Sequence, residues 1–123
     1  MKKSLLYLLV ILIAGCNQEE KVSPNVFFAG EIVNPTSSYV VLSKDDVVLD
    51  SAKLDENNRF SFQIPSIKEG LHHFNHGREY QYIYFQEGDS IQVRLNTIDF
   101  DESLVFSGNG AEINNFLLDL FLA

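Results

Sequence analysis

Hydrophobic and polar residues alternate along much of the chain, in short segments separated by turn-forming residues. The alternation is clearest at 60–64 and at 91–96, where every second residue is apolar. A period of two is typical of strands that bury one face. The same reasoning predicts strands at 26–33, 39–44, 47–54, 59–64, 71–76, 80–86, 91–96 and 104–106. Asn57 and Asn58 tolerate positive φ, so they predict a hairpin turn before the fourth strand. The pattern therefore predicts an all-β domain over 26–107, an antiparallel β-sandwich of about seven to eight short strands.

The spacing becomes helical after residue 107. Asn109 stands three residues before Glu112, an arrangement that resembles a capping box. Apolar residues then recur at helical intervals, at Ile113, Phe116, Leu117, Leu120 and Phe121. This spacing predicts a C-terminal amphipathic helix that buries its apolar face. Because no helix-ending residue precedes Ala123, we expect 108–123 to begin a helix that leads into a missing C-terminal region.

The first fifteen residues predict export from the cytoplasm. Lys2 and Lys3 precede an unbroken apolar run of ten residues at 5–14. A membrane-spanning helix needs about 20 apolar residues, whereas a secretory signal needs fewer. We therefore interpret 1–15 as a signal peptide.

The end of this segment identifies the kind of signal. Ile13-Ala14-Gly15-Cys16 resembles the bacterial lipobox, in which the cysteine is acylated and becomes the mature N-terminus. The alternatives are a signal that happens to contain a cysteine, or a buried apolar helix. We interpret Cys16, the single cysteine of the chain, as the lipidation site, and 16–25 as a lipidated tether. The chain then has no thiol pair for disulfide exchange.

Charge narrows the expected partners. Without the two signal lysines the chain has 7 basic and 17 acidic residues, so its net charge is 7 − 17 = −10. That charge argues against nucleic acid and against electrostatic binding to anionic lipid. Membrane attachment is expected through Cys16, in the cell envelope and at the outer membrane. Gln18-Glu19-Glu20 resembles an acidic signal for export to the cell surface. The sequence does not decide whether the protein lies on the periplasmic or the surface face of the outer membrane.

Three histidines, His72, His73 and His76, are the candidate metal ligands. On a strand, adjacent side chains point to opposite faces, and residues four apart are separated by about 13 Å. The three cannot converge on one ion unless the segment is a loop. We therefore expect surface or edge-strand histidines, with no metal and no other cofactor.

Tyr80, Tyr82 and Tyr84 share one face of a predicted strand. Such a row could stack on a glycan or on the side chains of a peptide. Alternatively, the strand is central and the terminal helix covers this face, because an amphipathic helix needs a surface to cover. We favour the covered arrangement and keep the tyrosines as the candidate binding face.

Asp89, Ser90 and His76 could suggest a hydrolase, but nothing around Ser90 resembles a nucleophile elbow, and Gly88-Asp89 is explained as a turn. We therefore expect no catalytic residue. Asp50-Ser51-Ala52 and Asp89-Ser90-Ile91 resemble the acceptor triplet of Bacteroidota O-glycosylation, so Ser51 and Ser90 are candidate modification sites.

Several short motifs resemble, in their order, the N-terminal region of a Bacteroidota lipoprotein family. They are Phe28-x-Gly30-x-Ile32, Asp50-Ser51-Ala52, Asp55-x-x-Asn58-x-Phe60-x-Phe62, Tyr82-Ile83-Tyr84, Gly88-Asp89-Ser90-Ile91 and Phe106-Ser107-Gly108-x-Gly110-Ala111-Glu112. In that family a β-sandwich domain of unknown function precedes a helical segment and a thioredoxin-like, thiol:disulfide-interchange domain. Asn58 departs from the pattern, because relatives often have glycine there. The resemblance implies a non-catalytic spacer or docking module of such a lipoprotein. The alternative is a stand-alone envelope lipoprotein that binds a glycan or peptide.

Overall fold

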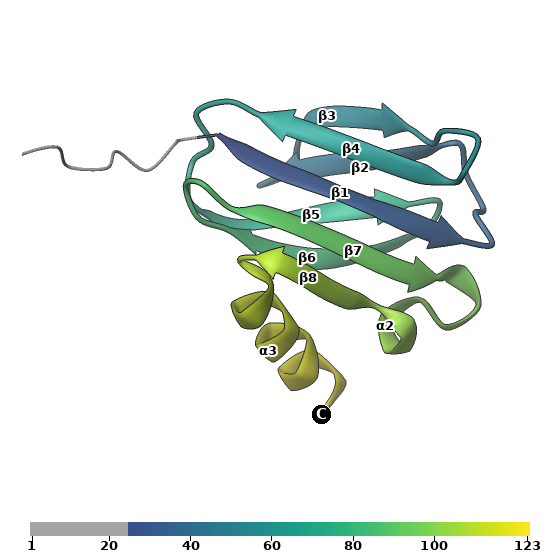
Figure 1. Ribbon diagram of the computed structural model, residues 1–123. Coiled ribbons are helices and arrows are strands. Elements are labelled where there is room, and N and C mark those ends of the chain that lie inside the picture. The colour runs from purple at the N-terminus through teal and green to yellow at the C-terminus, as the bar shows by residue number, and fades with distance from the viewer. Residues whose placement is uncertain (1–24) are drawn as a thin grey trace, which may run out of the picture.

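The computed structural model describes residues 25–123, which form two four-stranded sheets packed face to face (Figure 1). In sheet A the strand order is β4 (Arg59–Ile64), β1 (Val26–Val33), β7 (Ser90–Asn96), β8 (Val105–Asn109). In sheet B it is β3 (Val47–Lys53), β2 (Tyr39–Lys44), β5 (Gly70–His76), β6 (Glu79–Phe85). The prediction of an all-β sandwich is confirmed, and each predicted strand is present with its ends shifted by at most a few residues.

One pair of strands departs from the antiparallel prediction. β1 runs parallel to β7, with Phe27 opposite Ser90 and Val33 opposite Asn96, whereas every other strand pair is antiparallel. The pattern of apolar residues sets which face of a strand is buried, but it carries no information about which strand lies beside it. β1 thereby occupies the middle of sheet A, between β4 and β7.

The turns form where the sequence supplies residues that tolerate positive φ. Asp45 and Asp46 have φ of 49° and 64° and join β2 to β3. Positive φ at two adjacent turn residues matches the right-handed twist of the strands they connect. Asn58 has φ of 60° just before β4, as its residue type predicts. The predicted hairpin is wrong, because this turn joins β3 of sheet B to β4 of sheet A and the two strands do not pair.

The core lies between the sheets and is built around Phe28 on β1. Its ring centroid lies 5.3 Å from those of Phe60 and Phe74, 5.6 Å from Phe85 and 6.0 Å from Phe62. Offset and edge-to-face arrangements at these distances add to the hydrophobic stabilisation. Both sheets contribute to this cluster, so it joins the two layers.

A short helical connection between β7 and β8 was not predicted. It consists of the 3-10 helix η1 (Thr97–Asp99) and the helix α2 (Phe100–Ser103). The Ser103 hydroxyl accepts a hydrogen bond from the Asn96 N–H at 2.8 Å and donates one to the Asn96 carbonyl at 3.0 Å. Phe100 is buried in the core, so a single large apolar side chain anchors the segment. One residue gives no periodic signal, which explains why the sequence pattern misses it.

The C-terminal helix α3 (Ala111–Leu122) is present, but its start and its orientation differ from the prediction. Its N-cap is Gly110, at φ 104°, and no side chain caps it; the Asn109 amide instead donates a 3.4 Å hydrogen bond to the Gly88 carbonyl. α3 lies along the lower edge of the sandwich in Figure 1, next to β6 and β8. No helix within residues 25–123 is long and apolar enough to span a membrane.

Candidate functional site

The helix α3 turns most of its apolar side chains away from the sandwich. The prediction that these residues form the buried face is wrong. We call the following residues, which are 37% to 60% exposed, the outer face of α3: Ile113, Phe116, Leu117, Leu120, Phe121 and Leu122. The buried residues of the helix are Ala111, Asn114 and Leu118. An exposed, contiguous apolar surface of this kind marks an interaction site more often than a solvated one.

Two consecutive asparagines hold the helix in this orientation. The Asn114 side chain accepts a hydrogen bond from the Tyr84 N–H at 2.7 Å and donates one to the Tyr84 carbonyl at 2.9 Å. The Asn115 side chain forms the same pair of bonds with Phe106, at 3.0 Å and 2.9 Å. Each amide therefore occupies the place that another strand would take beside an edge strand, on β6 for Asn114 and on β8 for Asn115. Because the polar face of the helix is used in this way, the apolar face points outward.

A cleft of about 550 Å³ lies beside the first turns of α3. It is lined by Gln86, Gly110, Glu112, Ile113 and Phe116. The outer face of α3 is thus continuous with a recess in which a partner's side chain would fit.

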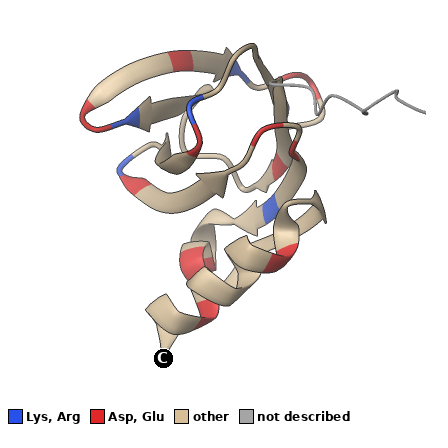
Figure 2. Cartoon of the chain, turned by 90° about the vertical axis from the view of Figure 1, so that its left-hand side faces the viewer, with Lys and Arg blue, Asp and Glu red and all other residues tan. Residues whose placement is uncertain are grey.

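The surroundings of α3 are acidic. Residues 95–123 contain no Lys or Arg and five acidic residues, namely Asp99, Asp101, Glu102, Glu112 and Asp119. Figure 2 shows the acidic positions along the helix and no basic one. A partner for this surface would combine apolar side chains with a basic or neutral rim.

The tyrosine row lies on the edge strand β6, so the prediction of a central, covered strand is wrong. Tyr80 and Tyr82 are 52% and 45% exposed, and only Tyr84, beside α3, is half-buried. The ring centroids of Tyr80 and Tyr82 are 5.8 Å apart. The ring of His73 on β5 lies 6.1 Å from Tyr80 and 6.3 Å from Tyr82. The result is a cluster of two exposed tyrosine rings and the half-buried ring of His73 on the outer face of sheet B.

Two of the three histidines are buried, which contradicts the expectation of surface or edge histidines. His72 and His76 point into the sandwich from β5, an inner strand of sheet B, and His73 points outward. This alternation is the one expected of neighbouring residues on a strand. Within residues 25–123 no group of three or more His, Cys, Asp or Glu side chains is placed to hold a metal ion.

Hydrogen bonds explain how the core accepts the two rings. His76 Nδ1 lies 3.0 Å from the Tyr39 carbonyl, and its Nε2 accepts a 2.9 Å bond from the Thr36 N–H. These partners fix the neutral tautomer with the proton on Nδ1. His72 Nδ1 lies 2.9 Å from the Gly70 carbonyl. Burial lowers the pKa of His72 below its ordinary value of 6.5, although the bond to Gly70 acts in the opposite direction.

Asp89, Ser90 and His76 are not assembled into a catalytic group. The Asp89 carboxylate accepts a 2.8 Å hydrogen bond from the Gln86 N–H and thereby closes the turn before β7. Burial raises the pKa of Asp89 above its ordinary value of 3.8, while the bond from Gln86 opposes that change. The Ser90 side chain is exposed, and both ring nitrogens of His76 are bonded to backbone groups.

Of the predicted modification sites, Ser51 and Ser90 both lie on strands with exposed side chains. Both hydroxyl groups are therefore accessible from solvent. Cys16 and the Gln18-Glu19-Glu20 segment lie outside the described residues.

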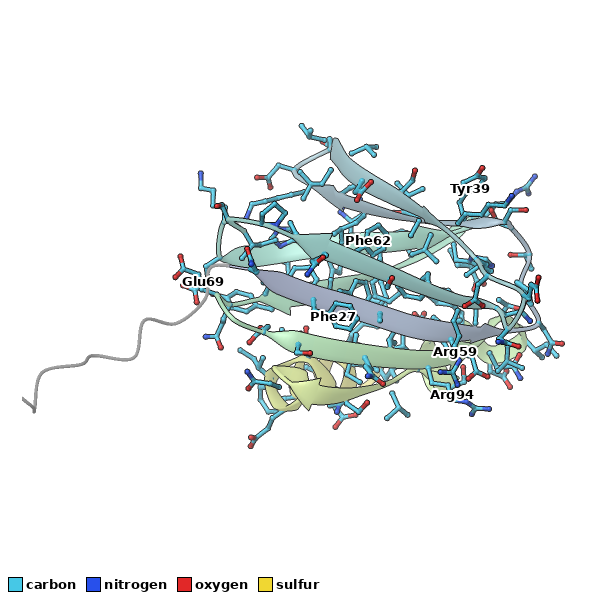
Figure 3. The ribbon with its side chains drawn as sticks, turned by 45° about the horizontal axis from the view of Figure 1, so that its top comes forward. Phe27, Tyr39, Arg59, Phe62, Glu69 and Arg94 are labelled. Carbon is cyan, nitrogen blue, oxygen red and sulfur yellow. The ribbon has the colours of Figure 1, made fainter. Side chains whose placement is uncertain are left out.

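An open trough of about 560 Å³ crosses the outer face of sheet A, and no sequence signal pointed to it. Phe27 and Val105 are among its lining residues, and Arg59, Glu31 and Arg94 form one end. The Glu31 carboxylate lies 3.6 Å from Arg59 Nη2 and 3.9 Å from Arg94 Nε. Figure 3 shows the two arginines near one end of the sheet and Phe27 farther along β1. These are exposed ion pairs, which contribute little to stability.

Comparison of the chain with protein-family models, curated proteins and solved structures finds no match. The fold itself defines the class of protein. It is a two-layer β-sandwich in which the C-terminal helix covers one edge.

Proposed function

We propose that this protein is a membrane-anchored, extracytoplasmic docking and spacer module without catalytic activity of its own. The lipid at Cys16 would attach it to the envelope, and the β-sandwich would set the distance from the membrane. The resemblance to thiol:disulfide-interchange lipoproteins supplies the partner: a thioredoxin-like domain with its helical segment. Redox chemistry would belong to that partner, because the single cysteine of this chain is assigned to the anchor.

The orientation of α3 is the observation that carries the proposal. Asn114 and Asn115 attach the polar side of the helix to both sheets, so the apolar side is presented outward on a fixed support. Burying an apolar side chain such as Phe116 or Leu120 stabilises a complex by about 1.5–3 kcal/mol. A helix with six exposed apolar residues is therefore suited to receive a partner that lays an apolar surface over it.

Thiol labelling in native membranes tests the proposal. We would introduce Phe116→Cys on the outer face of α3 and, as a matched control, Ile98→Cys at a residue that is 74% exposed in η1. Each variant is treated with a membrane-impermeant maleimide in opened cells, before and after denaturation, and the unsubstituted chain gives the background from Cys16. We expect the cysteine at 116 to react only after denaturation and the cysteine at 98 to react in both conditions. Equal labelling at both positions in native membranes would show that α3 is uncovered, and the docking proposal would be wrong.

An immunoblot of the membrane fraction with an antibody against the β domain identifies where the partner resides. A band several times larger than 14.0 kDa would place it in the same polypeptide. A band near that size would require a separate protein.

A second candidate function is recognition of a glycan or peptide by the aromatic cluster of sheet B. It is favoured by the exposure of Tyr80 and Tyr82 and by the ring of His73 beside them. Tyrosine fluorescence provides the assay, because the chain contains no Trp and three of its five Tyr lie on β6. Titration with envelope-derived oligosaccharides should change the emission of the wild type and not that of Tyr82→Ala. An unchanged wild-type signal across the oligosaccharides and an acidic and a basic peptide library would exclude this function.

A further inference from the structure

The edge strands of the two sheets are not equally protected against pairing with another chain. An edge strand exposes unpaired N–H and C=O groups, which are a template for an added strand. On β6 the Gln81 side chain accepts from the Tyr82 N–H at 2.8 Å, and Asn114 takes both groups of Tyr84. On β8 Asn115 takes both groups of Phe106. On β3 the Asp50 carboxylate accepts from the Ser51 N–H at 2.8 Å, so that edge is protected at a single group.

β4, the remaining edge, is open over its second half. The Asn58 carbonyl accepts from the Ile32 N–H of β1, and in an antiparallel pair the backbone groups then alternate between the neighbour and the edge. Arg59, Ser61 and Gln63 consequently direct their N–H and C=O groups outward. Both groups of Arg59 are taken by Asp55, at 2.9 Å for the N–H and 2.8 Å for the carbonyl. Among the hydrogen bonds of residues 25–123, no side chain binds the backbone N–H or carbonyl of Ser61 or of Gln63.

We propose that the β4 edge binds a second copy of this chain, strand to strand and antiparallel. Ser61 and Gln63 are two residues apart, so a two-fold axis at Phe62 places each opposite the other in the second copy. Both residues present outward groups, and the two pairs would therefore exchange four backbone hydrogen bonds. The same register places Arg59 opposite Pro65, so no two like charges meet. Such a contact is closed by its symmetry and does not propagate.

Exposed apolar surface favours this edge for self-association, and the position of α3 is compatible with it. The chain carries a net charge of −8, and β3 with the turns beside β3 and β4 carries Asp45, Asp46, Asp50, Asp55 and Glu56, so charge repulsion opposes contact here as it does at α3. The acidic helix α3 lies along the opposite edge of the sandwich from β4, so pairing at β4 keeps the two helices apart (Figure 1). β3 lies at the same edge as β4, and its Val47, Val48 and Leu49 are 45% to 64% exposed. The inference does not depend on the proposed function, because it leaves α3 free.

Two matched double variants test both the contact and its register. The side chains of Ser61 and Gln63 are exposed, so charged residues at these positions leave the core unchanged. Ser61→Lys with Gln63→Lys would place lysine opposite lysine twice, whereas Ser61→Lys with Gln63→Glu would place lysine opposite glutamate twice. Sedimentation equilibrium of the full chain in density-matched detergent gives the dimer dissociation constant of each protein.

We expect a wild-type dimer, a Lys/Lys variant whose dissociation constant is raised about tenfold, and a Lys/Glu variant that dimerises at least as tightly as the wild type. The Lys/Lys change also reduces the net negative charge, so general electrostatics alone predict the opposite order. A monomeric wild type would overturn the proposal. So would equal dissociation constants for the two variants, because association through the N-terminal segment or α3 would not distinguish them.

Discussion

Removing the Asn114 side chain should detach α3 from β6. Asn114 is 2% exposed and forms three hydrogen bonds: two with the backbone of Tyr84 and one, at 2.9 Å, to the Gly110 carbonyl. Asn114→Ala leaves the N–H and the carbonyl of Tyr84 without their partner. It also replaces the amide with a smaller group and leaves a space under the helix.

The expected loss of stability follows from these contacts. An unsatisfied buried polar group costs about 1–3 kcal/mol, and Tyr84 is only half-buried, so its two groups together should cost about 2–3 kcal/mol. Alanine is the better helix former and offsets up to about 0.7 kcal/mol. The free energy of unfolding should therefore fall by about 2 kcal/mol. For a domain of this size that corresponds to a decrease in Tm of about 8–16 °C.

Urea unfolding and hydrogen exchange together measure this effect. If α3 and the sheets unfold as one unit, the full 2 kcal/mol appears in the global free energy of unfolding. If α3 detaches first, the amides of α3 lose protection while those of β1 and β7 keep it. Asn114→Asp is the matched control of similar size: its second oxygen would face the Tyr84 and Gly110 carbonyls, so it should destabilise more than alanine does. A variant Asn114→Ala with wild-type Tm and wild-type exchange in α3 would refute the reasoning.

Three further changes test the core. Gly30→Ala places a Cβ about 2.6 Å from Val93 Cγ1 and 2.9 Å from Phe60, so we expect a destabilisation of about 1–3 kcal/mol by urea unfolding. Phe28→Ala opens the centre of the aromatic core and should cost about 3–5 kcal/mol in the same assay. Because the folded-state pKa of His72 is lowered, the unfolded chain binds the proton first, and stability should fall as pH drops below 6.5. Thermal melts of His72→Gln should show a smaller decrease over that range, and identical pH profiles would contradict the burial effect.

The strands could be predicted because two independent signals agree along most of the sandwich. Alternation marks the buried face, as in β4 and β7, and a residue that tolerates positive φ, such as Asn58 or Asp45, marks the turn. The parallel pairing of β1 with β7 could not be predicted, since it depends on the order of strands in space.

The candidate site could be predicted only in part, because its arrangement depends on side chains bonded to distant backbone. Helical spacing correctly predicts α3, but it predicts that the apolar side faces inward. In the structure the Asn114 side chain points inward, because its amide hydrogen-bonds to the backbone of an edge strand 30 residues away in sequence. The same limitation explains His76, whose burial depends on partners at Thr36 and Tyr39.

The position of β1 in sheet A also has a kinetic consequence. Phe27 must meet Ser90, 90 − 27 = 63 residues further along the chain, before the centre of that sheet can form. The hairpins of sheet B are local and can form early, whereas a parallel pair closes a long loop and folds late. A chain synthesised from its N-terminus therefore exposes Val26, Phe28 and Ile32 until almost the whole domain has been made. Chaperone protection of this first strand, rather than final stability, would then limit how much of the protein reaches its folded state.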